Sequence, residues 1–219
     1  MSIIMQSTGS ALANGRSVQV QFVLDYRSIY SYLANTQMKT LGVPIDYQFV
    51  DIVAVMKEVN NQPSPMCPPK ARYSHIDAMR WAQRYGVPLS ANRTLLDAMR
   101  QGALKNAFLS RAGLAAQRMG IFEQVNDALF SAVWAGSDDL VTEEGRSQFA
   151  VSRGIPAALW EVAESADVVT QLAANNARAV ANGVFGAPTF FVDQEIFFGN
   201  DRLSFVRDKL LVATTGAAQ

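Results

Sequence analysis

Apolar and polar positions alternate near the start of the chain and then give way to a continuous apolar run. Residues 18–24 (VQVQFVL) show this pattern, which is typical of a strand that enters a buried sheet. Residues 29–41 then carry apolar side chains at helical spacing and stop at Gly42. After Pro44, residues 45–53 return to a strand pattern. This order predicts a β-α-β unit with parallel strands and a right-handed crossover.

The middle of the chain has the apolar spacing of helices. Residues 61–69 (NQPSPMCPP) are rich in proline, which predicts an extended loop. Between this loop and residue 182 no segment has a convincing strand pattern, and glycines or Pro156 interrupt the helical spacing. The pattern therefore predicts helices at residues 70–85, 92–119, 121–135, 142–153 and 156–182.

The last part of the chain returns to strands. Residues 189–192 and 195–198 are mostly apolar, and the Asp193-Gln194 dipeptide between them predicts a tight antiparallel hairpin. The spacing of apolar residues predicts a closing amphipathic helix at residues 201–212.

The order β-α-β, helices, β-β-α predicts an α/β protein, with a thioredoxin-like core and a large all-helical insertion. We expect residues 1–17 to form a flexible tail, residues 18–60 and 183–214 to form the thioredoxin-like domain, and residues 61–182 to form the insertion domain. A doubly wound sheet whose helical middle hides weak strands is the alternative. The absence of β-rich runs from residue 70 to 180 argues against it.

Composition narrows the possible chemistry. The 219 residues are 49% hydrophobic, and 19 basic residues balance 19 acidic ones without a basic cluster, so we expect a compact protein that does not bind nucleic acid. Cys67 is the only cysteine and His75 the only histidine, which excludes an intrachain disulfide and a cysteine-based metal site. Because no signal-peptide pattern or membrane-length apolar run is present, we expect a cytoplasmic protein that does not enter membranes.

Ser28 stands at the junction of the first strand and the first helix, where its hydroxyl has two compatible roles. The ordinary role is that of a helix N-cap. The N–H groups and the dipole at such a helix end also stabilise negative charge. A serine there can therefore donate a hydrogen bond to a thiolate that a ligand brings.

Two later segments could hold such a ligand. Most X-Pro bonds are trans, but the proline before the third strand of a thioredoxin-like core is cis and leaves the backbone before it open to an extended peptide. We therefore predict a cis Ala187-Pro188 bond. Asn200 and Asp201 precede the last helix, either as simple caps or as groups that bind the carboxylate and ammonium at one end of a peptide.

The helix after the proline-rich loop places five side chains on one face: Lys70, Tyr73, Asp77, Arg80 and Trp81. A solvated face with one aromatic residue against the core is the simple interpretation. The functional interpretation is a lysine at a helix start that reaches an anionic ligand.

Three ordered motifs resemble the family of 2-hydroxychromene-2-carboxylate isomerases and kappa-class glutathione transferases, which are relatives of the bacterial disulfide oxidoreductases. The motifs are SIYSYLA from Ser28 onward, NNQPSPMCPPKARYSHIDAMRWAQRYGVPL, and GVFGAPTFFVDQEIFFGNDRL. The resemblance implies that glutathione is the cofactor and that Ser28 faces its sulfur. It also implies which residues hold glutathione, namely Asn61, Lys70, Ala187, Pro188, Asn200 and Asp201.

The sequence departs from the family pattern beside Ser28. Ile29 stands where a proline is usual, and Arg27 replaces an apolar residue, so the pocket next to Ser28 is altered. Arg27 and Tyr30 are the substrate contacts that we expect here. The main hypothesis is a glutathione-dependent isomerase of an aromatic ring-cleavage product, in which a thiolate adds reversibly to a conjugated carbon. A basic residue, Arg27 or Lys70, would then pair with the carboxylate of the substrate.

Other functions are compatible with the same resemblance. A kappa-like glutathione transferase or peroxidase would use the same site, and a non-catalytic module that binds peptides or thiols is a further alternative. A protein disulfide oxidoreductase is excluded, because Ser28 and Ser31 stand at the two cysteine positions. The resemblance also implies a homodimer, for which the helical block offers methionine and aromatic side chains such as Met119 and Trp134.

Overall fold

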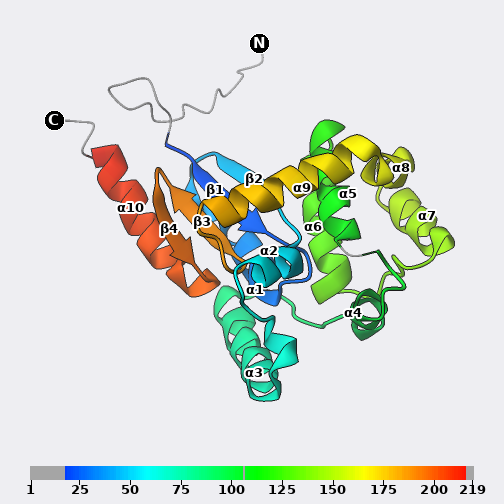
Figure 1. Ribbon diagram of the computed structural model, residues 1–219, viewed down its shortest axis with the longest axis horizontal. Coiled ribbons are helices and arrows are strands. Elements are labelled where there is room, and N and C mark those ends of the chain that lie inside the picture. Colours follow the sequence, from blue (N-terminus) through cyan, green and yellow to red (C-terminus); the bar gives the residue numbers. More distant parts are fainter. Residues whose placement is uncertain (1–17, 106, 216–219) are drawn as a thin grey trace, which may run out of the picture.

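A mixed sheet forms the centre of the computed structural model, which describes residues 18–105 and 107–215 (Figure 1). Its strands are β1 (Val20–Leu24), β2 (Ile45–Phe49), β3 (Thr189–Val192) and β4 (Glu195–Phe198), in the order β2-β1-β3-β4. Strand β1 pairs in parallel with β2 and antiparallel with β3, which pairs antiparallel with β4. The predicted thioredoxin-like core is therefore correct, and the hairpin has the predicted bounds. The predicted tail, residues 1–17, lies outside the described residues.

Helices surround this sheet and fill the segment between β2 and β3. The α-helices are α1 (Ile29–Asn35), α2 (Ile52–Glu58), α3 (Pro68–Tyr85), α4 (Arg93–Arg100), α5 (Phe108–Arg118), α6 (Phe122–Trp134), α7 (Glu143–Ser152), α8 (Ala158–Glu164), α9 (Ala166–Ala181) and α10 (Leu203–Thr215). Short 3₁₀ helices are η1 (Met38–Leu41), η2 (Ser64–Met66) and η3 (Asn200–Arg202). The helical insertion is thus present as predicted, and its status as a separate domain remains a prediction.

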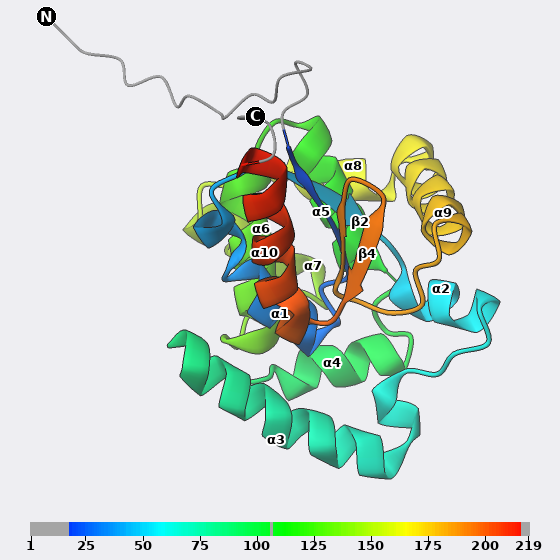
Figure 2. The ribbon, with the colours of Figure 1, turned by 90° about the vertical axis from the view of Figure 1, so that its left-hand side faces the viewer.

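Each face of the sheet contributes to a different apolar core, because successive side chains of a strand point to opposite faces. Val23 packs in a small cluster with Val55 of α2 and Ala179 of α9. Phe22 and Phe190 belong to the larger cluster, which also includes residues of α1, α10, α5 and α6. Figure 2 shows these layers, with α10 and α1 on one side of the strands and α9 and α2 on the other.

Several predicted boundaries were wrong because local capping interrupts the apolar pattern. Strand β2 ends at Phe49, since the Asp51 side chain accepts hydrogen bonds from the first turn of α2 and starts a helix there. Helix α1 ends at Asn35, and η1 continues to Leu41. The proline-rich loop contains η2, and α3 starts at Pro68, within the predicted loop, because proline suits the first turn of a helix.

Two predicted long helices are each broken in two. The segment between α4 and α5 contains Gly102 and Ala107 with positive φ angles of 76° and 57°, which a continuous helix does not allow. Ser165 separates α8 from α9, and its side chain accepts a hydrogen bond from Val168 N–H as a cap. Apolar spacing continues across both breaks, which explains why the pattern alone joins the helices.

The parallel pairing of β1 and β2 positions the candidate site. Leu24 pairs with Phe49, so both strands end at the same edge of the sheet. The Val50 N–H donates to the Leu24 carbonyl at 3.1 Å and extends this pairing by one residue. The turn that leads from β1 into α1 therefore lies beside the turn that leads from β2 into α2.

None of the helices within residues 18–105 and 107–215 combines the length and apolar character that a membrane crossing requires.

The contact between α5 and β2 generates a stability prediction. A Cβ atom at Gly113 would lie 2.6 Å from the ring of Phe49, which is fully buried. Gly113→Ala should therefore lower the free energy of unfolding by about 1–3 kcal/mol through overpacking, although alanine favours helices. Urea denaturation measures this change. In a Phe49→Leu background, where the ring is absent, the same substitution should cost less, and equal costs in both backgrounds would contradict the packing argument.

Candidate active site

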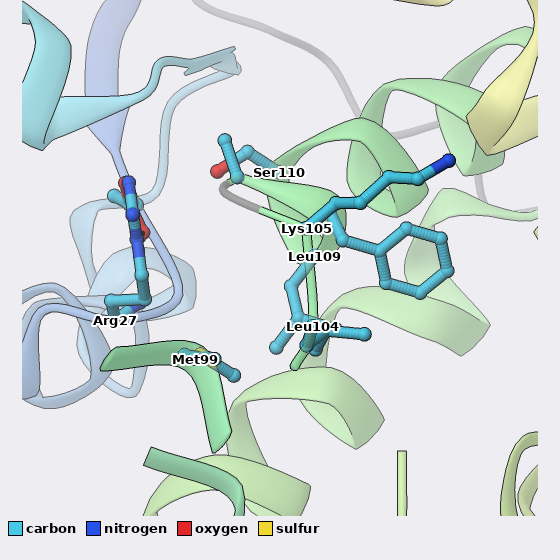
Figure 3. A pocket seen from close by; sticks show the side chains of 9 residues that line it. Arg27, Met99, Leu104, Lys105, Leu109 and Ser110 are labelled. Carbon is cyan, nitrogen blue, oxygen red and sulfur yellow. Dashed lines mark hydrogen bonds and ion pairs between the residues drawn. The ribbon is translucent and has the colours of Figure 1, made fainter. Parts of the chain in front are cut away.

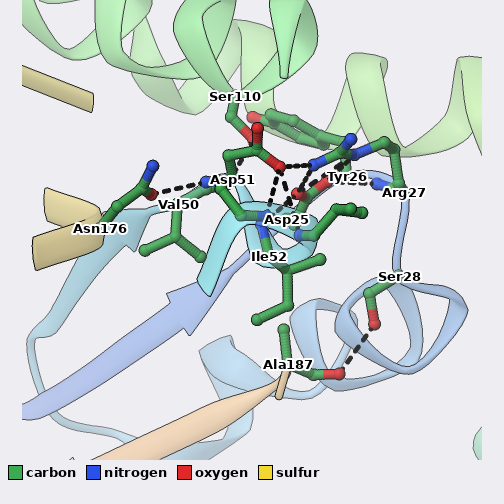
Figure 4. Close-up of polar contacts among 12 residues, drawn as sticks. Asp25, Tyr26, Arg27, Ser28, Val50, Asp51, Ile52, Ser110, Asn176 and Ala187 are labelled. Atoms are coloured by element: carbon green, nitrogen blue, oxygen red, sulfur yellow. Dashed lines mark hydrogen bonds and ion pairs between the residues drawn. The ribbon is translucent and has the colours of Figure 1, made fainter. Parts of the chain in front are cut away.

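Ser28 lies at the start of α1 and its hydroxyl makes two hydrogen bonds. The oxygen accepts the Ser31 N–H at 3.1 Å, which is the predicted N-cap. The hydroxyl also donates to the carbonyl of Ala187 at 2.9 Å, across the sheet edge (Figure 4). The single hydroxyl hydrogen of Ser28 is thus directed toward the turn that precedes β3.

The Ala187-Pro188 bond in this turn is cis, as predicted from the sequence. The Pro188 carbonyl accepts the Gly199 N–H at 3.0 Å, which ties the turn to the end of β4. Ala187 is half-buried and its carbonyl is already occupied by Ser28. Because a carbonyl oxygen has two lone pairs, a ligand N–H can bond to it beside the Ser28 hydroxyl or in its place.

Asn61 and two phenylalanines lie around the same turn. The Asn61 side chain donates to the Phe185 carbonyl at 2.8 Å and so joins the end of α2 to the segment before Pro188. The rings of Phe185 and Phe198 lie 4.5 Å apart and are each 42% exposed. A Cβ atom at Gly186 would lie 2.5 Å from the Phe198 ring, so this ring packs directly on the backbone next to Ala187. The pair forms an exposed aromatic surface beside the turn.

Asn200 begins η3, which packs against α1. It is only 3% exposed, and its Nδ2 atom has no hydrogen-bond partner among the described residues. The buried Ser31 hydroxyl on α1 also has no partner there. Buried polar groups are normally hydrogen-bonded, so these two atoms on neighbouring elements are exceptions. The Tyr85 hydroxyl lies next to Asn200 and donates to its carbonyl at 3.4 Å.

Asp201 follows Asn200 and is exposed. Its carboxylate forms an ion pair with Arg202 at 2.8 Å and lies close above Gly199. Gly199 has a φ angle of 106°, a region that favours glycine, and a Cβ atom there would collide with the Asp201 carboxylate. The glycine thus allows the acidic side chain to lie against the backbone after β4.

Arg27 points away from Ser28 into a cluster with two carboxylates (Figure 4). Its Nη2 atom lies 2.5 Å from Asp25 Oδ2 and 2.5 Å from Asp51 Oδ1, and its Nε lies 3.0 Å from Asp25 Oδ1. Asp25 is 1% exposed and also accepts the backbone N–H groups of Arg27 and Ile52. Burial by itself lowers the pKa of the Arg27 guanidinium, but the two carboxylates outweigh burial and raise this pKa above its ordinary value.

This cluster argues against the predicted contact between Arg27 and a substrate carboxylate. The guanidinium is already bound by two carboxylates, and a third anion would meet a net negative charge. Beside Arg27 lies a cavity of about 10 Å³, toward the segment that joins α4 to α5 (Figure 3). A volume of this size holds about one water molecule and no aromatic substrate. Arg27 instead connects the two turns at the sheet edge.

Tyr30 contacts α3 from α1, and Lys70 lies within α3. The Tyr30 hydroxyl donates to Asp77 Oδ2 at 3.0 Å and ties α1 to α3. Burial, followed by this hydrogen bond, raises the pKa of the Tyr30 phenol, which therefore stays protonated as a donor. Lys70 lies exposed in the first turn of α3 and forms no ion pair within the described part of the chain. Its ammonium group is available to an anion.

The structure thus brings Ser28, Ala187 and Pro188 into direct contact, with Asn61 and Asn200 nearby, and leaves Arg27 outside this group. Sequence reasoning missed Asp25 and Asp51, although each follows the last apolar residues of one of two parallel strands. That position is a signal, because such strand ends meet at one edge. Asp77 was predicted on one helix face with Lys70, but its contact with Tyr30, 47 residues away, had no signal in the sequence.

The chain resembles known proteins over most of its length. Residues 19–211 match the DSBA-like thioredoxin domain family, and the chain therefore belongs to that family. Within it, the chain is 31% identical over 199 residues to a 2-hydroxychromene-2-carboxylate isomerase from Sphingobium xenophagum, which covers 88% of this chain and 97% of that protein. A protein of the same name from Pseudomonas putida is 30% identical over 191 residues, 84% of this chain and 90% of that protein.

More distant relatives and solved structures share the fold. A glutathione S-transferase kappa 1 from Caenorhabditis elegans is 25% identical over 206 residues, 88% of this chain and 90% of that protein. A solved structure of 2-hydroxychromene-2-carboxylate isomerase superposes with a TM-score of 0.77 at 24% identity, over 92% of this chain and 99% of that chain. The resemblance deduced from the three motifs is therefore confirmed at the level of the family.

The Arg27 cluster generates the prediction for this site. Arg27→Met would leave the buried Asp25 carboxylate without its guanidinium, so the free energy of unfolding should fall by about 3–5 kcal/mol. Thermal and urea denaturation measure this. Arg27→Lys keeps the charge without the two-pronged contact and should cost less.

Arg100→Met is the matched control. Within the described residues Arg100 forms an ion pair with Asp97 of the same helix, and their side chains are 66% and 50% exposed. This change should therefore alter stability by no more than about 0.5–1 kcal/mol. Similar losses for Arg27→Met and Arg100→Met would show that the Arg27 cluster does not hold the two turns together.

Proposed function

We propose that the protein is a cytoplasmic, glutathione-dependent isomerase that acts on an aromatic ring-cleavage product of the 2-hydroxychromene-2-carboxylate type. The observation that carries this proposal is the Ser28 hydroxyl, which stands at the start of α1 and donates to the carbonyl before Pro188. The isomerases that share about 30% identity with nearly the whole chain support the same reaction class.

The residues around the turn fit glutathione. Asn200 has a buried Nδ2 donor that lacks a partner in the described part of the chain, which suits a carboxylate or carbonyl oxygen of a ligand. The exposed Asp201 carboxylate next to it suits an ammonium group. The γ-glutamyl end of glutathione carries both. Ala187, Asn61 and Lys70 would hold the remaining backbone and the other carboxylate.

The proposed role of Ser28 is to donate its one hydroxyl hydrogen to the sulfur of bound glutathione. When bound, glutathione supplies a thiolate nucleophile that adds to a conjugated carbon and later leaves, which allows a double bond to rotate or a ring to open. Ser28 transfers its hydrogen bond from the Ala187 carbonyl to the negatively charged sulfur and lowers the pKa of that thiol. The Ala187 carbonyl is then free to accept an N–H of the peptide.

The substrate contacts follow from the exposed groups beside the turn. Phe185 and Phe198 present apolar rings next to Ala187, which suits an aromatic substrate. Two carboxylates of the chain bind Arg27, so of the two cations expected for the substrate carboxylate we propose Lys70, whose ammonium group can hold this carboxylate or that of glutathione. Tyr30 would orient the substrate through a phenol that stays neutral.

The kappa-class relatives favour a second candidate on the same site, a glutathione transferase or peroxidase. The two functions differ in what happens to glutathione. An isomerase regenerates it at each turnover, whereas a transferase or peroxidase consumes it. Conversion of many equivalents of hydroxychromene carboxylate per glutathione, followed by absorbance, distinguishes them.

Ser28→Ala should raise the pKa of the bound thiol and lower turnover by about 10²–10³-fold, because one donor to concentrated charge is lost. Affinity for glutathione should change little, since other residues hold both ends of the peptide. Ultraviolet titration of the bound thiolate, calorimetry and a turnover assay measure the three quantities. Ser28→Cys should form a mixed disulfide with glutathione, visible by mass spectrometry.

Ser165→Ala is the matched control for the cap. Ser165 caps α9 as Ser28 caps α1, so its loss should cost about 1 kcal/mol of stability and leave turnover unchanged. If Ser28→Ala behaves like Ser165→Ala in every assay, Ser28 is only a helix cap and the proposed function is wrong.

The proposed homodimer is tested separately. Trp134 does not belong to its interface, since it is 7% exposed and its indole N–H donates to the Tyr26 carbonyl at 2.7 Å inside the core. Met119 is half-buried against the same core.

Light scattering should give a mass near twice the 23.9 kDa of one chain. A mass that stays at 23.9 kDa across a concentration series would exclude the dimer.

A further inference from the structure

A second cavity lies between α1, η1 and α6, and none of its lining residues belongs to the candidate active site. Its volume of about 290 Å³ is close to the lower limit of cavities that bind small molecules in proteins. Strand β2 and the loop after α3 complete its walls through Tyr47 and Pro88. The cavity is therefore large enough for a compact organic ligand.

Three aromatic rings line this cavity: Tyr32, Tyr47 and Phe130. Phe130 is 1% exposed and its ring centre lies 6.1 Å from that of Tyr32. Tyr47 is fixed on the other side by a ring contact with Phe122 at 4.7 Å. Tyr32 is 6% exposed and Tyr47 is half-buried, so Tyr47 is the most exposed of the three and offers apolar surface to a ligand.

The charges at the cavity are mostly negative. Glu123 and Asp127 of α6 carry two carboxylates, against the single ammonium group of Lys39. Lys39 lies 3.3 Å from Asp127, with 77% and 57% of their side chains exposed, so this ion pair is weak and easily exchanged. The chain thus places one of its own ammonium groups where a ligand ammonium could bind.

Two buried amide side chains, those of Asn35 and Asn126, hold the Asp127 carboxylate through hydrogen bonds. Asn35 donates to Asp127 Oδ1 at 2.8 Å and accepts from Asn126 at 2.8 Å, and Asn126 accepts from the Tyr26 hydroxyl at 2.9 Å. Asn35 and Asn126 both line the cavity, and both are more than nine-tenths buried. This chain of hydrogen bonds holds Asp127 in position before any ligand arrives, which reduces the entropy cost of binding.

We propose that this cavity binds a small aromatic amine in its ammonium form, with the ammonium group at Asp127 and Glu123 and the aromatic group against Tyr32, Tyr47 and Phe130. An anion of the same shape would meet two carboxylates and is excluded. The proposal is independent of the proposed isomerase function, because no residue of the candidate active site takes part.

Calorimetric titration of the full chain with phenethylamine, without glutathione, tests this proposal. Saturable binding in the millimolar range or tighter is expected, and 3-phenylpropionate, an anion of similar shape, should not bind. Asp127→Asn keeps the acceptor for Asn35 but removes the charge, so affinity should fall by about fivefold. Lys39→Met removes the competing ammonium group and should raise affinity.

Asp97→Asn is the control, since Asp97 is a partly exposed carboxylate of α4 that lies outside the cavity. It should bind phenethylamine as the unaltered protein does. Absence of saturable binding, equal binding of phenylpropionate, or equal affinity in Asp127→Asn and Asp97→Asn would each overturn the proposal. Glu123→Gln gives a second variant, on the exposed surface of α6, if Asp127→Asn fails to fold.

Discussion

The parallel pairing of β1 with β2 is the constraint on which the rest of the site depends. It ends both strands at one edge, so the turn before α1 and the turn before α2 meet there. Asp25 and Asp51 approach each other for this reason, and Arg27 neutralises part of their charge. Ser28 is the residue after Arg27, and its backbone N–H donates to the Asp25 carbonyl. The position of the serine hydroxyl is thus set by backbone pairing and by a buried ion cluster together.

The sequence predicts the order of elements well, because that order depends on local apolar spacing. The hairpin at residues 189–198 was predicted to the residue, since turn chemistry and strand pattern agree there. Helix ends were predicted less well. Asp51 and Ser165 stop or start helices by hydrogen bonds that the apolar pattern does not contain. The breaks at Gly102 and Ala107 likewise depend on backbone angles that leave the spacing intact.

The candidate site was predictable where it follows from the family resemblance. Ser28, Ala187 and Pro188 come together as expected. The partner of Tyr30 was not predictable, because Asp77 is brought to it only by the packing of α3 against α1. Asp25 and Asp51 follow two parallel strands and could have been found from that position, but their contacts with Arg27 are known only from the structure. A lone arginine beside a serine that could donate to a thiolate suggests an anion site from sequence. The structure changes this interpretation, because two carboxylates of the same chain already bind the guanidinium.

The hydrogen bond between Ser28 and Ala187 has a consequence for selectivity. A simple thiol that takes the Ser28 hydrogen would leave a half-buried carbonyl without a donor, and such a loss costs about 1–3 kcal/mol. A thiol on a peptide brings its own N–H and avoids this loss. In the proposed function, this hydrogen bond therefore favours thiols that carry a peptide N–H over small thiols, before any contact with the ends of the peptide is counted.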